Sequence, residues 1–353
     1  MLFKAKKLLR RKRIYIPALV LFIIILLEIM LRIIPVKVSG IDLSIRVDDT
    51  LYSMTRGVRQ KPNTARNWTG LGPPTIWHFN NLGFRGSSLE TNKIDGNVDR
   101  VVFLGDSVVM GLGVEEDEAL PNQLQKALIP KEYNGGTIHL YEVFNLGNWG
   151  YSGISELAVM KEVGQKMKPK VVIVASFVDD AIEANSFKQN KTFITLRGIP
   201  DSLLPEPVST LLKDHSNLYL FLLSRYYAII TRFEADAKPD VQGKERGLRL
   251  NEESYKQIAA ISSQIGAKML LVGVPERTEL FAEDQKVENE RLAELQNIAK
   301  RNSLNLYDLA SDIHSYPNPD DLFISDNYHF SPLGNTFIAQ KIADYLQKNN
   351  LLP

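Results

Sequence analysis

The sequence predicts a three-layer α/β/α domain with a parallel sheet, preceded by one N-terminal transmembrane helix. Two patterns predict this fold: short apolar runs alternate with amphipathic stretches from about residue 100 onward, and one long apolar stretch lies close to the N-terminus. The composition agrees, because 353 residues with 44% hydrophobic and 24% charged side chains are typical of a globular protein. A disordered chain, a collagen-like repeat and a disulfide-stapled miniprotein are excluded.

The charge is unevenly distributed along the chain. Seven basic residues and no acidic residue lie within the first 13 positions, although the whole chain carries a formal charge of only +1. The remainder is therefore more acidic than basic, which favours anionic lipid over nucleic acid as the partner of the basic tail. The absence of cysteine excludes a thiol nucleophile and thiolate metal sites, and we expect neither a metal nor an organic cofactor.

Residues 1–13 form the basic tail, and residues 14–34 read as a transmembrane helix. Only Pro17, Glu28 and Arg32 in this stretch are not apolar. A helix of this length measures roughly 32 Å, close to the thickness of the hydrocarbon core of a bilayer. Glu28 and Arg32 are four residues apart, so they share a helix face and can pair near the far interface. The alternative is a cleaved signal peptide, but the stretch is long and no small-x-small cleavage site follows it.

The basic flank predicts a single-pass protein of the inner, cytoplasmic membrane with its N-terminus in the cytoplasm. The catalytic domain would then be periplasmic or extracellular. Residues 35–98 are rich in Gly, Pro, Asn and aromatic residues, and we expect an irregular lead-in segment there. The main domain is expected to cover residues 99–353.

Five short runs in the main domain predict buried strands: Arg100–Leu104, Ile138–Phe144, Val171–Ser176, Lys268–Val274 and Leu304–Tyr307. Continuous apolar runs indicate strands covered on both faces, as in parallel sheets. Amphipathic stretches at about 117–129, 152–168, 251–265, 285–302 and 332–347 predict the covering helices.

Two of these helices carry end signals. Asn251 and Gly266 fit the N-cap and C′ positions of one helix, and Ser331-Pro332 fits the start of the last. Residues from about 185 to 250 fit the alternation poorly and are expected to be an insertion. Its aromatic part, 219–233, is compatible with a lid over an acyl pocket, a surface that rests on lipid, or a helix packed in the core.

Ser107 is the candidate nucleophile. It lies in the tetrapeptide LGDS directly after the first predicted strand, at the sheet edge where ligands collect in parallel α/β folds. A serine hydroxyl needs a base to become nucleophilic, and among the five histidines only His329 has an acid three residues before it. That acid, Asp326, could hold the ring tautomer and stabilise the imidazolium. His139 is expected to be a packed strand residue, and His78, His215 and His314 have no supporting pattern.

An acyl-transfer site also requires donors for the oxyanion. The second strand leads into Asn145–Ser152, where Gly150 could bring a backbone N–H close to a substrate, and the third strand ends in Ser176-Phe177-Val178-Asp179-Asp180. Taken alone, these segments are also ordinary loops that require glycine and acidic caps.

Three blocks in this order, LGDSVVMGLGV, FNLGNWGYSG and DNYHFSPLGN, resemble the GDSL/SGNH hydrolases. The upstream NNLGFRG and the basic, apolar start are similar to membrane-anchored bacterial members. The resemblance covers about residues 80–346 and implies a flavodoxin-like fold. It also implies that Ser107, Asp326 and His329 form a triad, and that the N–H groups of Ser107 and Gly150 serve the oxyanion hole.

One position departs from the family pattern. The third block of the family offers an asparagine that donates to the oxyanion, whereas this chain has Asp179. An ionised carboxylate has no hydrogen to donate and repels the developing charge. Three alternatives follow. Asp179 is held protonated, or another group replaces the missing donor, or the site is weak or inactive.

The sequence therefore predicts a membrane-anchored serine ester hydrolase that forms an acyl-serine intermediate. Acetyl esters of envelope glycans or lipids are the expected substrates. An O-acyltransferase of envelope polysaccharide would use the same triad, with a sugar hydroxyl in place of water. A non-catalytic module that binds a glycan or a partner protein is the third alternative, and Asp179 favours it. The oligomeric state stays open.

Overall fold

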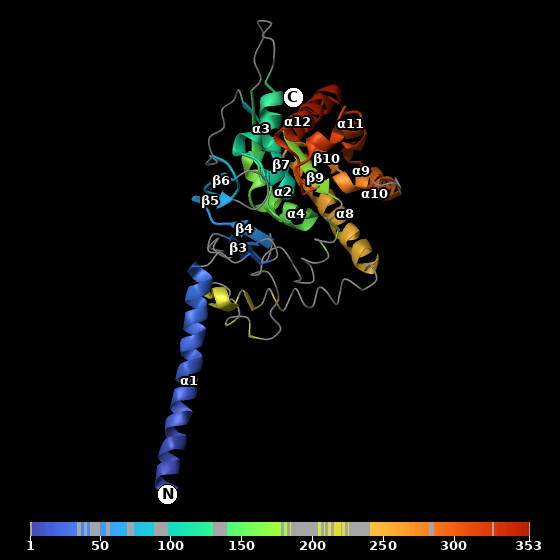
Figure 1. Cartoon of the computed structure of the whole chain (residues 1–353). Helices are drawn as coiled ribbons and strands as arrows, with labels where there is room; N and C mark the ends of the chain where they lie inside the picture. Colours follow the sequence, from blue (N-terminus) through green and yellow to red (C-terminus); the bar gives the residue numbers. More distant parts are fainter. Residues whose placement is uncertain are drawn as a thin grey trace. The chain divides into compact units, whose positions relative to one another are not determined.

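The computed structural model of the chain describes residues 2–33, 98–129, 140–177, 241–281, 286–326 and 328–352, with shorter stretches between 37 and 87 and individual residues between 180 and 225. The chain divides into two compact units. The first comprises Met1–Asp48 and Ile199–Pro239, and the second comprises Asp49–Gly198 and Asp240–Pro353. Figure 1 shows both units coloured along the chain.

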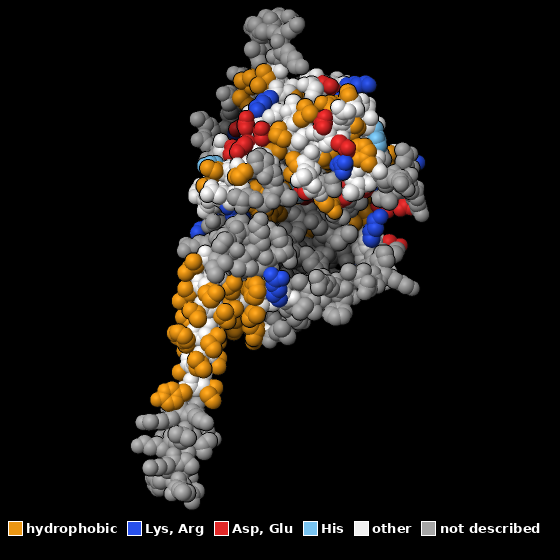
Figure 2. All heavy atoms as spheres, in the orientation of Figure 1, with side chains coloured by type: hydrophobic (Ala, Val, Ile, Leu, Met, Phe, Trp, Pro, Cys, Tyr) orange, Lys and Arg blue, Asp and Glu red, His pale blue; other side chains and the backbone are white. Residues whose placement is uncertain are grey.

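The first unit is built on one long helix, α1 (Leu2–Ile33). Its segment Tyr15–Ile33 has a mean hydropathy of 2.6, and none of that segment is buried. Figure 2 shows hydrophobic side chains around the described part of this helix. The helix is therefore long and apolar enough to cross a membrane. Two short strands, β1 (Lys37–Val38) and β2 (Ile41–Asp42), pair in antiparallel fashion after it.

The second unit contains the predicted parallel sheet. Its strands are β7 (Val98–Leu104), β8 (Leu140–Asn145), β9 (Val171–Phe177), β10 (Lys268–Val274) and β11 (Asn305–Asp308). Their order is β11-β10-β9-β7-β8, and every pairing is parallel. Counted along the chain, this is the 2-1-3-4-5 order of flavodoxin-like folds. The predicted fold class is confirmed, and the strand order reverses between β7 and β9.

Helices cover both faces of this sheet (Figure 1). Val101 and Phe103 of β7 belong to the core cluster that includes residues of α3 (Leu120–Ala127) and α12 (Pro332–Lys348). Val102 and Leu104 belong to the cluster that includes residues of α4 (Gly153–Glu162), α8 (Val241–Gln264) and α10 (Lys286–Asn302). This alternation explains why the strands read as continuous apolar runs. Among the described residues, this unit also contains the helices α2 (Ser107–Met110), α9 (Arg277–Leu280) and α11 (Ala310–His314), with 3-10 turns η2 (Glu116–Glu118), η3 (Gly164–Met167) and η4 (Pro319–Leu322).

Three of the four predicted helix-end signals are confirmed. The Ser331 hydroxyl caps α12 by accepting from Gly334 N, with Pro332 at the first helical position, and Gly266 has a φ of +75° after α8. The prediction for Asn251 was wrong, because α8 begins ten residues earlier and Asn251 lies inside it. Its side chain instead accepts a hydrogen bond from Gly153 N, at the start of α4.

Residues 35–98 also differ from the expected irregular segment. Besides the β1–β2 pair, two antiparallel hairpins lie in the described part of this range, the first formed by β3 (Thr50–Ser53) and β4 (Gly57–Gln60), the second by β5 (Thr64–Trp68) and β6 (Thr75–Phe79). Buried and exposed residues alternate along β6, and its buried Trp77 and Phe79 pack with Met110 and Leu112. The second hairpin therefore packs against the segment that follows Ser107.

Candidate active site

Ser107 occupies a sharp turn at the carboxyl edge of the sheet. It is the first residue of α2, three positions after β7 ends, and Asp106 caps this helix by accepting from Val108 N at 2.9 Å. Because Ser107 is the first helical residue, its N–H has no acceptor within α2. The turn lies beside the point where the strand order reverses, which is where α/β sheets of this type bind ligands.

The structure brings Ser107, His329 and Asp326 together across 222 positions of sequence. Ser107 Oγ lies 2.8 Å from His329 Nε2, and His329 Nδ1 lies 2.5 Å from Asp326 Oδ2. The side chains of His329 and Asp326 are each 12% exposed, so the pair is mostly shielded while the hydroxyl end stays within reach. A chain of serine, imidazole and carboxylate in this geometry can move a proton from the hydroxyl to the ring.

The loop before α12 holds the imidazole and the carboxylate in place. Asp326 Oδ1 accepts from the backbone N–H groups of Tyr328 and His329, both at 3.0 Å. Ile324 N donates to His329 O at 2.9 Å, next to a β-bridge between Phe323 and Phe330. The position of the ring is thus set by main-chain bonds on both sides of the loop.

These bonds also determine the charge of Asp326. Burial raises the pKa of this carboxyl, but the hydrogen bond to the His329 ring, the charge of that ring and the two backbone N–H donors outweigh burial and lower the pKa overall. Asp326 is therefore ionised at neutral pH. An ionised acceptor keeps the proton on Nδ1, which leaves Nε2 free to accept the proton of Ser107.

The loop after β8 lies against the turn that carries Ser107. Leu146 N donates to Phe103 O, and Asn148 N donates to Gly105 O. A Cβ atom at Gly147 would lie 2.6 Å from Met110 N, so this approach requires glycine. Gly150, the second expected oxyanion donor, lies on this loop with a φ of +58°. Asp179 lies outside the described residues, and its role stays a prediction.

A buried carboxyl that the sequence analysis did not select, that of Asp180, lies shortly after β9 and interacts electrostatically with Asp106 beside Ser107. Asp180 Oδ2 accepts from Phe177 N at 2.9 Å and lies 3.2 Å from the Tyr255 hydroxyl, which is itself 3.0 Å from Ser176 Oγ. Burial, reinforced by the negative charge of Asp106, raises the pKa of Asp180 well above its ordinary value. The only sequence signal was the pair of adjacent acidic residues at the end of a buried strand.

The raised pKa of Asp180 predicts a pH-dependent cost of folding. The folded state retains a proton that the unfolded chain releases above about pH 4, so the free energy of unfolding falls as pH rises toward the folded pKa. Asp180→Asn keeps an acceptor for Phe177 N and cannot ionise. We expect its stability, relative to the wild type, to increase from pH 4 to pH 7 in denaturant unfolding of both proteins. Parallel pH profiles would contradict this prediction.

Arg85 was also missed as a residue of interest, although it lies in the GFRG motif. Its guanidinium donates to Gly111 O and, at 2.6 Å, to Val114 O, and it lies 5.2 Å from the Trp77 ring centroid. Burial lowers its pKa to about 10, opposed by Glu116, Glu115 and Glu118, so the side chain stays cationic at neutral pH. Arg85 therefore links the segment directly after α2 to Trp77 on β6.

Replacing Arg85 by methionine is expected to destabilise the fold. The change leaves two buried carbonyl groups without their donor, each of which costs about 1–3 kcal/mol. We expect a loss of roughly 2–5 kcal/mol in denaturant unfolding. Arg249→Met is the control, because it makes the same change at an exposed arginine of the same unit, on α8. If Arg85→Met lost no more free energy of unfolding than the control, the stabilising role of the two Arg85 hydrogen bonds would be contradicted.

The other histidines that the structure describes lie on other elements of the chain. His78 is exposed on β6, His314 is exposed on α11, and His215 belongs to the first unit. His139, expected to be packed in a strand, lies outside the described residues. Within the described part of the chain, no cluster of three His, Asp or Glu residues is suited to hold a metal ion.

Several solved structures are similar to this chain. The crystal structure of TesA covers 72% of this chain and all of its own, at 14% identity and a TM-score of 0.44. The psychrotrophic esterase EstA from Pseudoalteromonas sp. covers 71% and 97%, at 13% identity and a TM-score of 0.42. A GDSL-like lipase from Bacteroides thetaiotaomicron covers 71% and 89%, at 13% identity and a TM-score of 0.39. No family model and no curated protein sequence matches.

Proposed function

We propose that this chain is a membrane-anchored serine ester hydrolase that acts through an acyl-serine intermediate. The observation that supports this most directly is the 2.8 Å separation between Ser107 Oγ and His329 Nε2, continued at 2.5 Å from Nδ1 to Asp326. A surface serine that is not part of such a relay is a poor nucleophile, because its proton has no acceptor when the oxygen attacks.

The first half of the reaction acylates Ser107. Its Oγ attacks the ester carbonyl carbon while His329 Nε2 takes the hydroxyl proton, and the N–H groups of Ser107 and Gly150 stabilise the oxyanion. The tetrahedral intermediate collapses as the ester bond breaks, and the imidazolium returns its proton to the departing alcohol. Asp326 stays ionised throughout and stabilises the imidazolium.

The second half releases the acid. Water attacks the acyl-serine carbonyl while His329 takes one of its protons, and the imidazolium then returns that proton to Ser107 Oγ as the carboxylic acid leaves. We propose acetyl esters of envelope glycans or lipids as substrates, with the second unit periplasmic or extracellular. The basic tail and the apolar helix α1 support this location.

Hydrolysis of p-nitrophenyl acetate by the purified full chain tests the proposal. We expect turnover that is lost in Ser107→Ala and retained in Ser315→Ala, a matched serine at the end of α11. Addition of an acetylated glycan and an unacetylated acceptor glycan distinguishes release of acetate from transfer to a sugar hydroxyl. Absence of turnover between pH 5 and pH 9 would contradict the hydrolase and favour the binding module.

Asp179 allows a separate prediction about the rate. Loss of one oxyanion donor costs on the order of 10²–10³ in rate in other serine hydrolases. If Asp179 is a lost donor, Asp179→Asn should raise kcat for p-nitrophenyl acetate by up to that factor. A fall in kcat would show that the acid has acquired its own role. Asp99→Asn, at the start of β7, is the control for the same change of charge in the same unit.

A further inference from the structure

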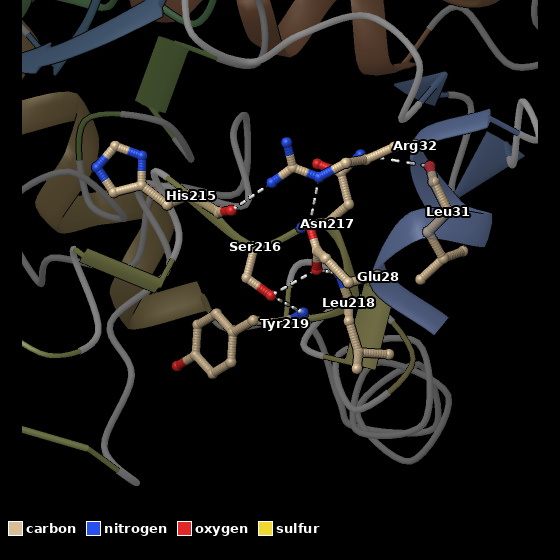
Figure 3. Close-up of polar contacts among 8 residues, drawn as sticks. All are labelled: Glu28, Leu31, Arg32, His215, Ser216, Asn217, Leu218 and Tyr219. Atoms are coloured by element: carbon tan, nitrogen blue, oxygen red, sulfur yellow. Dashed lines mark hydrogen bonds and ion pairs between the residues drawn. The ribbon is translucent and has the colours of Figure 1, made fainter. Parts of the chain in front are cut away.

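The Glu28–Arg32 pair on α1 binds a second segment of the first unit (Figure 3). Arg32 Nε lies 2.8 Å from Glu28 Oε1, as the spacing predicted. Both side chains also form hydrogen bonds with residues 215–218. Glu28 accepts from Ser216 Oγ at 2.9 Å, Asn217 N at 3.0 Å and Leu218 N at 2.9 Å, and Arg32 Nη2 donates to His215 O at 2.8 Å.

These contacts satisfy the ends of two helical segments that meet at Ser216. Ser216 N donates to Leu212 O in the segment before it, and Ser216 Oγ accepts from Tyr219 N in the segment after it. The first N–H groups of the second segment and the last carbonyl of the first have no partners within their own helices. Glu28 accepts from the former and Arg32 donates to the latter. We call this arrangement, Glu28 and Arg32 with residues 215–219, the corner.

The corner fits an environment with little water. A carboxylate in an apolar helix is costly unless hydrogen-bond donors surround it. Glu28 has four donor groups, three from residues 216–218 and one from Arg32, and its side chain is only 21% exposed. A surface ion pair in water would not need this degree of saturation, since water satisfies exposed carboxylates.

Helical residues on both sides of the corner expose apolar side chains. Val208, Leu211 and Leu222 are 45%, 59% and 56% exposed, and each is helical. Arg225 lies over the Phe221 ring at 5.1 Å, an arrangement that lets a cationic side chain extend along apolar surface toward lipid headgroups. Figure 2 shows hydrophobic side chains continuing from α1 onto the segment beside it. Exposed apolar surface that continues from a membrane-spanning helix is suited to lipid.

We propose that the corner holds Val208, Leu211 and Leu222 against the outer surface of the phospholipid bilayer, as a second lipid-contact surface beside α1. This inference rests on the membrane anchoring in the proposed function and is independent of the ester chemistry. It assigns to the anchor the part of the predicted insertion (about 185–250) that belongs to the first unit, Ile199–Pro239. Among the alternatives for its aromatic part, it selects the surface that rests on lipid.

The chain contains no cysteine, so single cysteines can report on each position. The full chain would be reconstituted in vesicles of phosphatidylethanolamine and phosphatidylglycerol, with an environment-sensitive fluorophore at Leu211→Cys or Leu222→Cys. Ile24→Cys, in the middle of the apolar segment, reports insertion of α1. Ile129→Cys, an exposed apolar position of the second unit, is the matched control. Quenching by a nitroxide on the lipid and by aqueous iodide is then measured.

We expect lipid quenching at 211 and 222 to exceed that at 129 by at least about twofold, with correspondingly weaker quenching by iodide. Glu28→Gln should reduce lipid quenching at 222 while leaving quenching at 24 unchanged. Glu253→Gln, the same change at an exposed glutamate of the second unit, should have no effect.

Strong iodide quenching at 211 and 222 together with lipid quenching at 24 would overturn the proposal while retaining the anchor. Protection from both quenchers would also overturn it, because protein would then cover this surface. Loss of lipid quenching at 24 would overturn the anchor and this proposal together. None of these outcomes bears on turnover of p-nitrophenyl acetate, which tests the hydrolase separately.

Discussion

Alanine at His329 is expected to reduce kcat for p-nitrophenyl acetate by a factor on the order of 10⁶, as removal of the base does in another serine hydrolase. Among the described residues, the His329 ring, 2.8 Å away, is the base that can take the proton of Ser107. Without it, Ser107 Oγ must attack as a neutral hydroxyl. The KM should change little, because the ring acts on the reacting atoms and contributes little to binding of the ground state.

His314→Ala is the matched control for this change. His314 is an exposed histidine on α11 of the same unit, and its replacement is expected to leave kcat within about twofold of the wild type. Circular dichroism of both variants checks that each is folded. A folded His329→Ala protein with kcat within about tenfold of the wild type would contradict the assigned role of the ring.

Asparagine at Asp326 is expected to reduce kcat by about 10⁴, the size of the same change in another triad. An amide at this position can donate to Nδ1, which would place the ring proton on Nε2, facing Ser107. The hydroxyl would then have no acceptor for its proton. The measurement is kcat for p-nitrophenyl acetate, with Asp320→Asn as the control, since Asp320 is exposed and pairs only with Arg277 among the described contacts.

The lowered pKa of Asp326 adds a pH criterion to this prediction. As pH falls from neutral, the wild-type carboxylate stays ionised to below its usual pKa of about 3.9. Loss of activity between pH 7 and pH 5 in the wild type must then come from another group. If Asp326→Asn retained kcat, or if the wild type lost activity through protonation of Asp326 above pH 5, the assigned role would be contradicted.

The parallel sheet could be predicted because its strands are buried on both faces and therefore read as apolar runs. Lys268–Val274 was predicted to the residue, and the other strands within a few residues. The first ten residues of α8 were missed because they contain Gly243 and Gly247 and few apolar side chains. Tertiary packing overrides the weak propensity there, since a Cβ at Gly247 would lie 1.7 Å from Ala181 O.

The three residues of the relay were predictable because each carries a local signal: a serine directly after a strand, and an acid three residues before a histidine. Arg85 and Asp180 carry no such signal. They are held in part by backbone groups, Gly111 O and Val114 O for Arg85 and Phe177 N for Asp180, and every sequence offers backbone groups. Only the fold shows which of them a side chain reaches.

The corner on α1 illustrates the same limit. The sequence predicts that Glu28 and Arg32 pair, because they are four residues apart on one helix face. It contains no pattern that connects Glu28 to Asn217 and Leu218, which lie 189 and 190 positions further along and offer only main-chain N–H groups to it.

Covalent labelling of the full chain with a fluorophosphonate, followed by mass spectrometry of the intact protein and its peptides, tests the activated serine most directly. We predict one adduct per chain, on the peptide that contains Ser107, with no adduct in Ser107→Ala and much slower labelling in His329→Ala. An unlabelled Ser107 in folded protein, or an adduct on a different serine that persists in Ser107→Ala, would contradict the account.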